Sequence, residues 1–224
     1  MWTGSANVTD AGWTRQENNI IQLASTELAG GYRADFDQLG RSGQITGSGS
    51  GDTGTAQLGT TTAGWAFAPG GADHRRGLGR AGQRRPRPDR RGVHGADLAH
   101  HPRCAGRGAG PGAPLSGVYD TGQMTPIVPQ RRKSATGKPT AALFDRIAAH
   151  LVAKKSAPYT PHGVHDFMHH KLLVCDDTVA TGSFNLSHNA AGNAENSPTP
   201  HCGDLARRYT TSITELIRTY SAQQ

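Results

Sequence analysis

Two stretches of the chain repeat one pattern, and this repeat constrains the fold more than any other feature of the sequence. The stretches 4–18 and 182–196 both begin with Gly-Ser-x-Asn and end with Glu-Asn, at a constant offset of 178 residues. At an offset of 177, apolar positions of 27–39 match those of 204–216, and their spacing predicts an amphipathic helix in each copy. The sequence therefore predicts two copies of one α/β unit, each with a Gly-Ser-x-Asn loop, a strand and a helix.

The second copy carries the clearest chemical signal, the pattern His-x-Lys-x4-Asp-x5-Gly-Ser-x-Asn within 169–185. His169 and Lys171 are expected on one strand, where positions i and i+2 leave the same face. Asp176 is expected in the turn of a hairpin, whose returning strand brings Ser183 and Asn185 back beside them. An imidazole, an ammonium, a hydroxyl and an amide at one place are typical of phosphodiester chemistry. Donors bind the non-bridging oxygens, and a nitrogen base attacks or protonates the leaving group.

In these residues the chain resembles the phospholipase D superfamily, whose signature is His-x-Lys-x4-Asp followed by Gly-Ser-x-Asn. The likeness covers roughly 1–40 and 115–224, and long matches such as 4–19 are similar to actinobacterial members. It implies phospholipase D-like α-β-α sandwich units in two tandem copies, the first incomplete. It also implies a phosphohistidine intermediate and no metal or other cofactor.

The resemblance also implies roles for individual residues. His169 belongs to the second motif, whose His usually protonates the leaving alcohol, and Glu195 is expected to hold its other ring nitrogen. Asp176 is more readily explained as a tie within the hairpin. The expected residues are catalytic His169, Lys171, Asp176 and Glu195, phosphate-binding Ser183, Asn185, Ser5 and Asn7, and supporting Gly182, Gly4 and Glu17.

The first copy departs from the family pattern. With the spacing of the second copy, its His, Lys and Asp would lie before Met1, so the sequence predicts a protein truncated at its N-terminus. Three interpretations stay open: a phosphodiesterase that hydrolyses or transfers a phospholipid, a homodimeric nuclease of the family, and an inactive fragment. A phospholipid is the leading substrate class and nucleic acid the second, and peripheral membrane contact is compatible with the first.

The middle of the chain differs in composition from both copies and divides the sequence into three predicted parts, 1–40, 41–114 and 115–224. Residues 41–65 are rich in Gly, Ser and Thr, which is typical of a flexible linker. Residues 71–114 hold ten Arg and three Asp, a balance equal to the net charge of +7 of the whole chain. This tract has few large apolar residues and is expected to be disordered. Its Arg, Gly, Ala and Pro bias also fits a frameshift hypothesis.

Further elements follow from local patterns. A strand is expected within 18–24 and another at 115–120, and Pro139 is expected to begin a helix that ends near Lys154. Pro198 and Pro200 argue against a central strand in the second copy. The three Cys lack metal-ligand spacing, and neither a signal peptide nor a membrane-spanning run is recognisable, so the compartment stays open.

Overall fold

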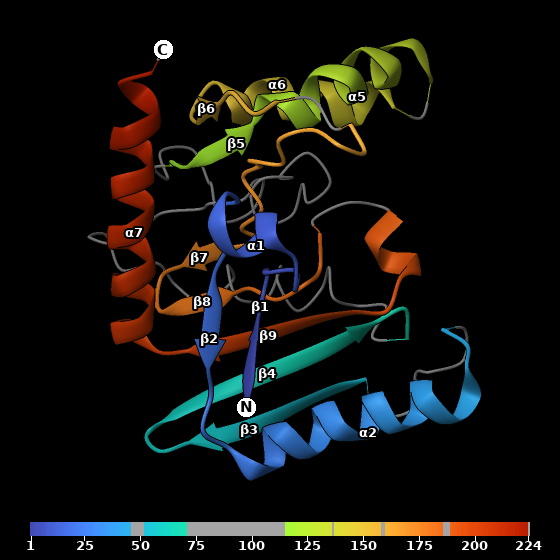
Figure 1. The fold of residues 1–224 in the computed structure, drawn as a ribbon. Helices are drawn as coiled ribbons and strands as arrows, with labels where there is room; N and C mark the ends of the chain where they lie inside the picture. Colours follow the sequence, from blue (N-terminus) through green and yellow to red (C-terminus); the bar gives the residue numbers. More distant parts are fainter. Residues whose placement is uncertain (46–51, 71–114, 136, 158–159, 186–188, 224) are drawn as a thin grey trace.

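The computed structural model describes residues 1–45, 52–70, 115–135, 137–157, 160–185 and 189–223, and it confirms the predicted α/β fold class. The predicted disorder of 71–114 lies outside these residues. Strands form a two-stranded sheet β1-β2, a five-stranded sheet ordered β3-β4-β9-β8-β7, and a parallel pair β5-β6. Figure 1 shows α2 running along the hairpin β3–β4 and α7 standing beside the other edge of the large sheet.

The elements follow one another in this order: β1 (Trp2–Gly4), α1 (Asp10–Thr14), β2 (Ile20–Gln22), α2 (Thr26–Ser42), β3 (Thr53–Leu58), β4 (Thr61–Ala68), β5 (Val118–Asp120), α5 (Thr121–Lys133), α6 (Lys138–Ala148), β6 (Val152–Lys154), β7 (Leu173–Cys175), β8 (Thr178–Ala180), the 3-10 turn at Asn189–Gly192, β9 (Glu195–His201) and α7 (Gly203–Ser221). No helix in the described segments is both long and apolar enough to cross a bilayer.

Both helices predicted from the repeat are present, as α2 and α7. The hydroxyl of Ser25 accepts a hydrogen bond from the main-chain nitrogen of Leu28 at 3.2 Å and caps α2. Leu28 is fully buried against β2 and β3, whereas Phe36 of the predicted stripe is 74% exposed. In α7, Ala206 and Ile213 are buried on the β7–β8 hairpin.

The predicted linker at 41–65 is wrong over the part that the structure describes. Residues 53–68 form the antiparallel hairpin β3–β4, and β4 pairs with β9 along seven residues, Thr62↔His201 to Ala68↔Glu195. Ala56, Ala63 and Phe67 are buried and provide an inward apolar face in a segment whose composition suggests coil. Composition alone misses this because a partner strand, rather than local propensity, orders the segment.

The prediction that Pro198 and Pro200 exclude a central strand is also wrong, because β9 lies in the middle of the five-stranded sheet. The carbonyl of Pro198 accepts from Thr181 of the β8 side at 3.3 Å, so both prolines turn their missing N–H groups toward β8. Pairing with β8 is accordingly reduced to Thr178↔His201, while the ladder with β4 is complete. The two prolines are tolerated because both face the edge of β9 that pairs only weakly with β8.

The region 115–157 differs from expectation at its helices. The strand predicted at 115–120 is present as β5, and Pro139 lies in the first turn of α6 as predicted. However, α6 ends at Ala148, and Lys154 ends strand β6, which is parallel to β5. The helix α5 was not predicted, because Pro126 and Pro129 obscure its pattern.

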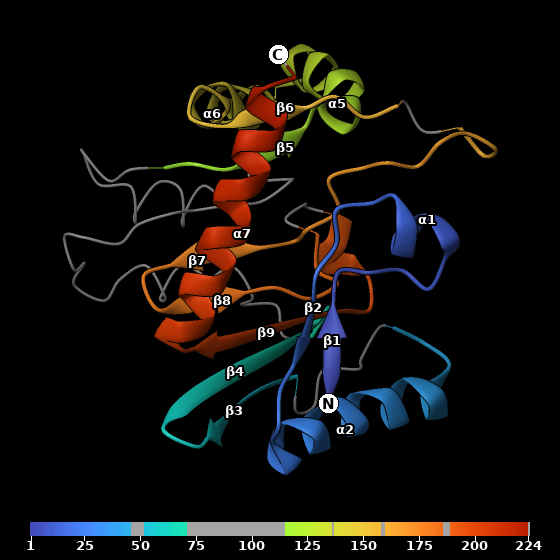
Figure 2. The same ribbon diagram turned by 60° about the vertical axis from the view of Figure 1, so that its left-hand side comes forward.

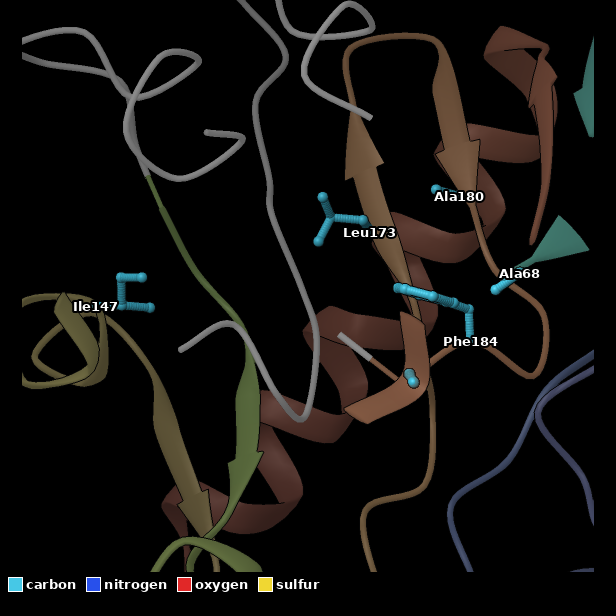
Figure 3. Close-up of a cluster of buried hydrophobic side chains, with 6 residues drawn as sticks. Ala68, Ile147, Leu173, Ala180 and Phe184 are labelled. Carbon is cyan, nitrogen blue, oxygen red and sulfur yellow. The ribbon is translucent and has the colours of Figure 1, made fainter. Parts of the chain in front are cut away.

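The core beneath the motif brings distant segments together. Leu173 of β7, Ala180 of β8, Phe184 and Ala68 of β4 belong to one buried cluster, with Ile147 approaching from α6 (Figure 3). The hairpin of the motif is present, but its first strand covers only Leu173–Cys175, so the residues before it lie outside regular secondary structure. Tertiary contacts must therefore position His169.

Candidate active site

The segment that carries His169 is held by the first copy of the repeat. The main-chain nitrogen of Glu17 donates to the carbonyl of Phe167 at 3.0 Å, and the nitrogen of His169 donates to the carbonyl of Glu17 at 2.9 Å. The imidazole of His170 contacts the carbonyl of Asn18 at 2.6 Å. Residues 17–18 thus form a short parallel bridge with 167–170, which joins the two copies at the motif.

A buried carboxylate holds the same segment from the other side. Asp120, at the end of β5, is fully buried and accepts from the main-chain nitrogen of Met168 at 2.7 Å. Its other oxygen accepts from Gln123 at 2.9 Å and from the hydroxyl of Ser156 at 2.5 Å. Three donors compensate the burial of this charge, so Asp120 serves as a structural anchor immediately before His169.

Asn18 determines which nitrogen of His169 carries the proton. The side-chain nitrogen of Asn18 donates to the carbonyl of Gly12 at 2.9 Å, which directs its Oδ1 toward Nδ1 of His169 at 3.0 Å. Because an amide oxygen only accepts, Nδ1 must bear the hydrogen. In the neutral ring, the lone pair then lies on Nε2.

The surroundings of His169 favour its neutral form. The pKa of His169 is lowered to about 4, first by burial and then by the nearby ammonium of Lys171, while a hydrogen bond with the main chain of Ser5 opposes the change. Burial also lowers the pKa of His170, against the opposing effect of its hydrogen bond to Asn18. At neutral pH the site therefore presents an uncharged imidazole beside a cation.

Lys171 is the cation of the site. Its side chain is buried, 8% exposed, and Nζ donates to the carbonyl of His169 at 3.1 Å. This contact holds the ammonium against the main chain of His169, although both residues precede β7 and the predicted common strand is wrong for them. A buried ammonium next to a neutral imidazole is suited to binding an anion.

The serines of the two Gly-Ser-x-Asn loops make the same contacts in both copies. The hydroxyl of Ser183 accepts from the main-chain and side-chain nitrogens of Asn196 at 3.0 and 3.2 Å. The hydroxyl of Ser5 accepts from the corresponding nitrogens of Asn19 at 3.0 and 3.4 Å. Asn19 is therefore the structural equivalent of Asn196, and the alignment of Asn18 with Asn196 is wrong by one residue.

This shift explains why Asn18 occupies the place expected for Glu195. Once Asn19 is matched with Asn196, Asn18 is matched with Glu195, the preceding residue in each copy. Asn18 contacts the ring of His169 in the opposite copy, whereas Glu195 accepts a hydrogen bond from the side-chain nitrogen of Asn193 at 3.4 Å. The partner of His169 thus comes from the first copy, and only the change of offset from 178 to 177 along the repeat could have indicated it.

The two copies also exchange hydrogen bonds in a symmetric way. The hydroxyl of Thr3 donates to Oδ1 of Asn196 at 2.8 Å, and that of Thr181 donates to Oδ1 of Asn19 at 2.7 Å. Tyrosine hydroxyls from the two equivalent helices add contacts to the same oxygens, Tyr32 at 3.3 Å and Tyr209 at 3.1 Å. The repeat seen in the sequence is therefore a structural pseudo-symmetry that spans the site.

The glycines of the two loops allow close approach of the equivalent asparagine strands. A Cβ atom on Gly182 would lie 2.3 Å from the carbonyl oxygen of Asn196, and one on Gly4 would lie 2.1 Å from that of Asn19. Gly182 also has a φ of 124°, which side chains rarely adopt. The predicted supporting role of both glycines is thus explained by backbone packing.

Three further predicted residues, Asp176, Asn7 and Asn185, lie in turns and loops. Asp176 has a φ of 52° in the β7–β8 turn, in agreement with its interpretation as a hairpin residue. Asn7 is exposed in the loop after β1, and Asn185 is half-buried after Ser183. Among the residues that the structure describes, no three His, Cys, Asp or Glu side chains gather as a metal site would require.

No protein-family model and no curated protein matches the chain. Two solved structures similar to it are a phospholipase D family member, Nuc from Salmonella typhimurium, and NucT from Helicobacter pylori. Nuc is 17% identical with a TM-score of 0.47, over 71% of this chain and 95% of Nuc. NucT is 14% identical with a TM-score of 0.47, over 71% of this chain and 97% of NucT. The roles of residues in the site therefore rest on the geometry of this chain.

Proposed function

We propose that this chain cleaves phosphodiesters with His169 as the nucleophile. The observation that carries the proposal is the neutral imidazole of His169, held at Nδ1 by the Asn18 amide oxygen at 3.0 Å and flanked by the buried Lys171. The resemblance implies that His169 is the proton donor. A ring whose pKa is about 4 is a poor donor at neutral pH but a competent nucleophile.

The proposed reaction has two displacements. Nε2 of His169 attacks phosphorus, the bond to the leaving alkoxide breaks, and the alkoxide takes a proton as it departs as an alcohol. Water, or a second alcohol, then attacks the phosphohistidine and breaks the P–N bond, which releases a phosphate monoester or a new diester. Lys171, with Ser183 and Asn185 as further proposed contacts, stabilises the charge on the non-bridging oxygens.

The described residues provide one His–Lys pair of the motif, and the leaving alkoxide needs a proton from another group. We propose that a second molecule of this protein provides the complementary His–Lys pair, in a homodimer. Activity per protein molecule should then rise with protein concentration up to the dissociation constant of the dimer.

A phospholipid is the substrate class that we favour. The loop between Ser5 and Asn18, whose two ends contact His169, exposes Val8 at 90% and Trp13 at 60%. Figure 2 shows α1, which carries Trp13, projecting from the body of the molecule. The ionic side chains within this loop are Asp10, Arg15 and Glu17, so it has no positive excess to attract a polyanion. Apolar side chains at the rim fit a substrate with an apolar part.

The first prediction is that the wild-type protein hydrolyses bis(p-nitrophenyl) phosphate and that His169→Ala lowers kcat at least about a thousandfold, since the nucleophile is lost. During turnover, mass spectrometry should find a p-nitrophenylphosphoryl group on His169, because only one of the two ester bonds is broken in the first step, and this P–N adduct should be labile in acid. The matched control is His162→Ala, an exposed His, which should keep wild-type activity.

Substrate class is decided with the same protein. In one assay the substrate is phosphatidylcholine in mixed micelles, and the release of choline is measured. In a separate assay the substrate is short single-stranded DNA, and the release of nucleotides is measured. Cleavage of DNA alone would replace the phospholipid proposal with a nuclease, and absence of turnover on all three substrates at every protein concentration would refute the catalytic proposal.

A further inference from the structure

A second group of polar side chains lies behind the segment that holds His169. The hydroxyl of Tyr220, near the end of α7, donates to Oε1 of Glu17. The same oxygen lies 3.8 Å from Nζ of Lys154, at the end of β6. Nζ of Lys154 also lies 5.2 Å from the centre of the Tyr220 ring. Three elements that are distant in sequence thus meet at one carboxylate.

Lys154 and Tyr220 are removed from solvent, whereas the side chain of Glu17 is 32% exposed. Lys154 and Tyr220 are each 6% exposed. Burial raises the pKa of Tyr220, with further raising by the hydrogen bond to Glu17, so the hydroxyl remains a donor at physiological pH. A buried ammonium requires a counter-charge, and Glu17 provides one within the residues that the structure describes.

Glu17 connects this cluster to His169 through its own main chain. Its nitrogen and carbonyl make the hydrogen bonds of 3.0 Å to Phe167 and 2.9 Å to His169, and the next residue, Asn18, holds the imidazole. We propose that Glu17 is a positioning residue whose carboxylate, held by Tyr220 and Lys154, fixes the segment that orients His169. The proposal rests on the proposed function only for its kinetic consequence.

The sign of a pKa shift separates positioning from direct electrostatics. Burial of His169 depresses its pKa, so a loosened segment that exposes the ring should raise that pKa toward the ordinary value of 6.5. Loss of a nearby carboxylate should instead lower the pKa of His169, because the negative charge that stabilises the imidazolium is removed. The two explanations for an effect of Glu17 therefore predict shifts of opposite sign.

The experiment is an NMR titration of the His169 imidazole in the full chain, assigned by the loss of its signal in His169→Ala. Glu17→Gln and Tyr220→Phe are both expected to raise the pKa of His169 by about one unit or more. Glu215→Gln, on the exposed face of α7, is the matched control and should leave this pKa unchanged. In turnover assays the two variants should lower kcat about tenfold while KM stays within about twofold, because Glu17 does not contact substrate.

A fall or no change in the pKa of His169 in folded Glu17→Gln overturns the proposal, as does a lower melting temperature without a pKa shift in both variants. Should Glu17→Gln fail to fold, Tyr220→Phe, which retains both charges, decides by the same criterion. A wild-type protein without phosphodiesterase activity would refute the proposed function, while the titration would still decide the role of Glu17.

Discussion

At the scale of single residues, Asn18 has the largest influence on the chemistry of the site. An amide at this position orients the ring of His169 without adding charge, while burial and the nearby Lys171 lower the pKa of the ring and keep the imidazole neutral at physiological pH. A carboxylate there would lose the donation to Gly12 but would still accept from Nδ1 and would stabilise the imidazolium. The identity of this residue is therefore expected to shift the pKa of His169, and with it the pH range in which the ring is neutral.

Asn18→Asp should raise the pKa of His169 by about one unit or more, because a carboxylate accepts from Nδ1 in place of an amide. In the wild type, activity that needs the neutral ring should fall only as the pH approaches about 4. In the variant, the acid limb of the kcat/KM profile should move to higher pH. Asn193→Asp, at an exposed position, is the control, and an unchanged acid limb in Asn18→Asp would contradict the assignment.

The same depressed pKa links His169 to stability. The folded-state pKa lies below the unfolded value of about 6.5, so the folded state binds fewer protons. Stability from this group is present above pH 6.5 and is lost as the pH falls toward 4. His169→Gln should reduce this acid-induced loss.

At the scale of elements, composition misled where a partner strand decided the outcome. The Gly- and Thr-rich segment 53–68 becomes a hairpin because β9 offers a seven-residue ladder. The strand β9 contains two prolines because its edge toward β8 needs few donors. The hairpin of the motif and the helices α2 and α7 were predictable, since their turn residues and apolar spacing are local.

Gly182→Ala tests how the Gly-Ser-x-Asn loop is packed. Its φ of 124° and the 2.3 Å approach of a Cβ atom to the Asn196 carbonyl predict a loss of at least about 2 kcal/mol in unfolding free energy. Gly43→Ala, at a φ of 61° with open space around it, should cost only about 1 kcal/mol. Urea denaturation measures both, and equal losses would show that backbone conformation alone, without the contact to Asn196, explains the glycine.

At the scale of the whole molecule, the two copies are joined through exchanged hydrogen bonds. Thr3 and Thr181 each bond an asparagine of the other copy, and 17–18 bridges to 167–170. These contacts make the first copy part of the site of the second, beyond its two predicted phosphate-binding residues. Loss of these contacts is therefore expected to destabilise both copies.

Asn19→Ala and Asn196→Ala should therefore each lower the stability of the whole described fold by about 1–3 kcal/mol, since each leaves buried partners without a bond. Unfolding followed by far-ultraviolet circular dichroism and by tryptophan fluorescence should remain a single, coincident transition in both variants. Separate transitions for the two probes would contradict the coupling. Asn193→Ala, at an exposed position outside this network, is the control.

Sequence reasoning alone predicted the α/β class, the repeat, the helices α2 and α7 and the motif hairpin, and it singled out His169 and Lys171 as the pair that we propose to be reactive. These features follow from local spacing, which holds wherever the segment lies. Only the tertiary structure decided that Asn18 rather than Glu195 holds His169, that a Gly-rich segment pairs with a Pro-containing strand, and that Glu17 joins α7 to the site. Each of these depends on which segments meet across more than a hundred residues. A one-residue change in the offset of the repeat, which is small in the sequence, changes which side chain reaches the ring.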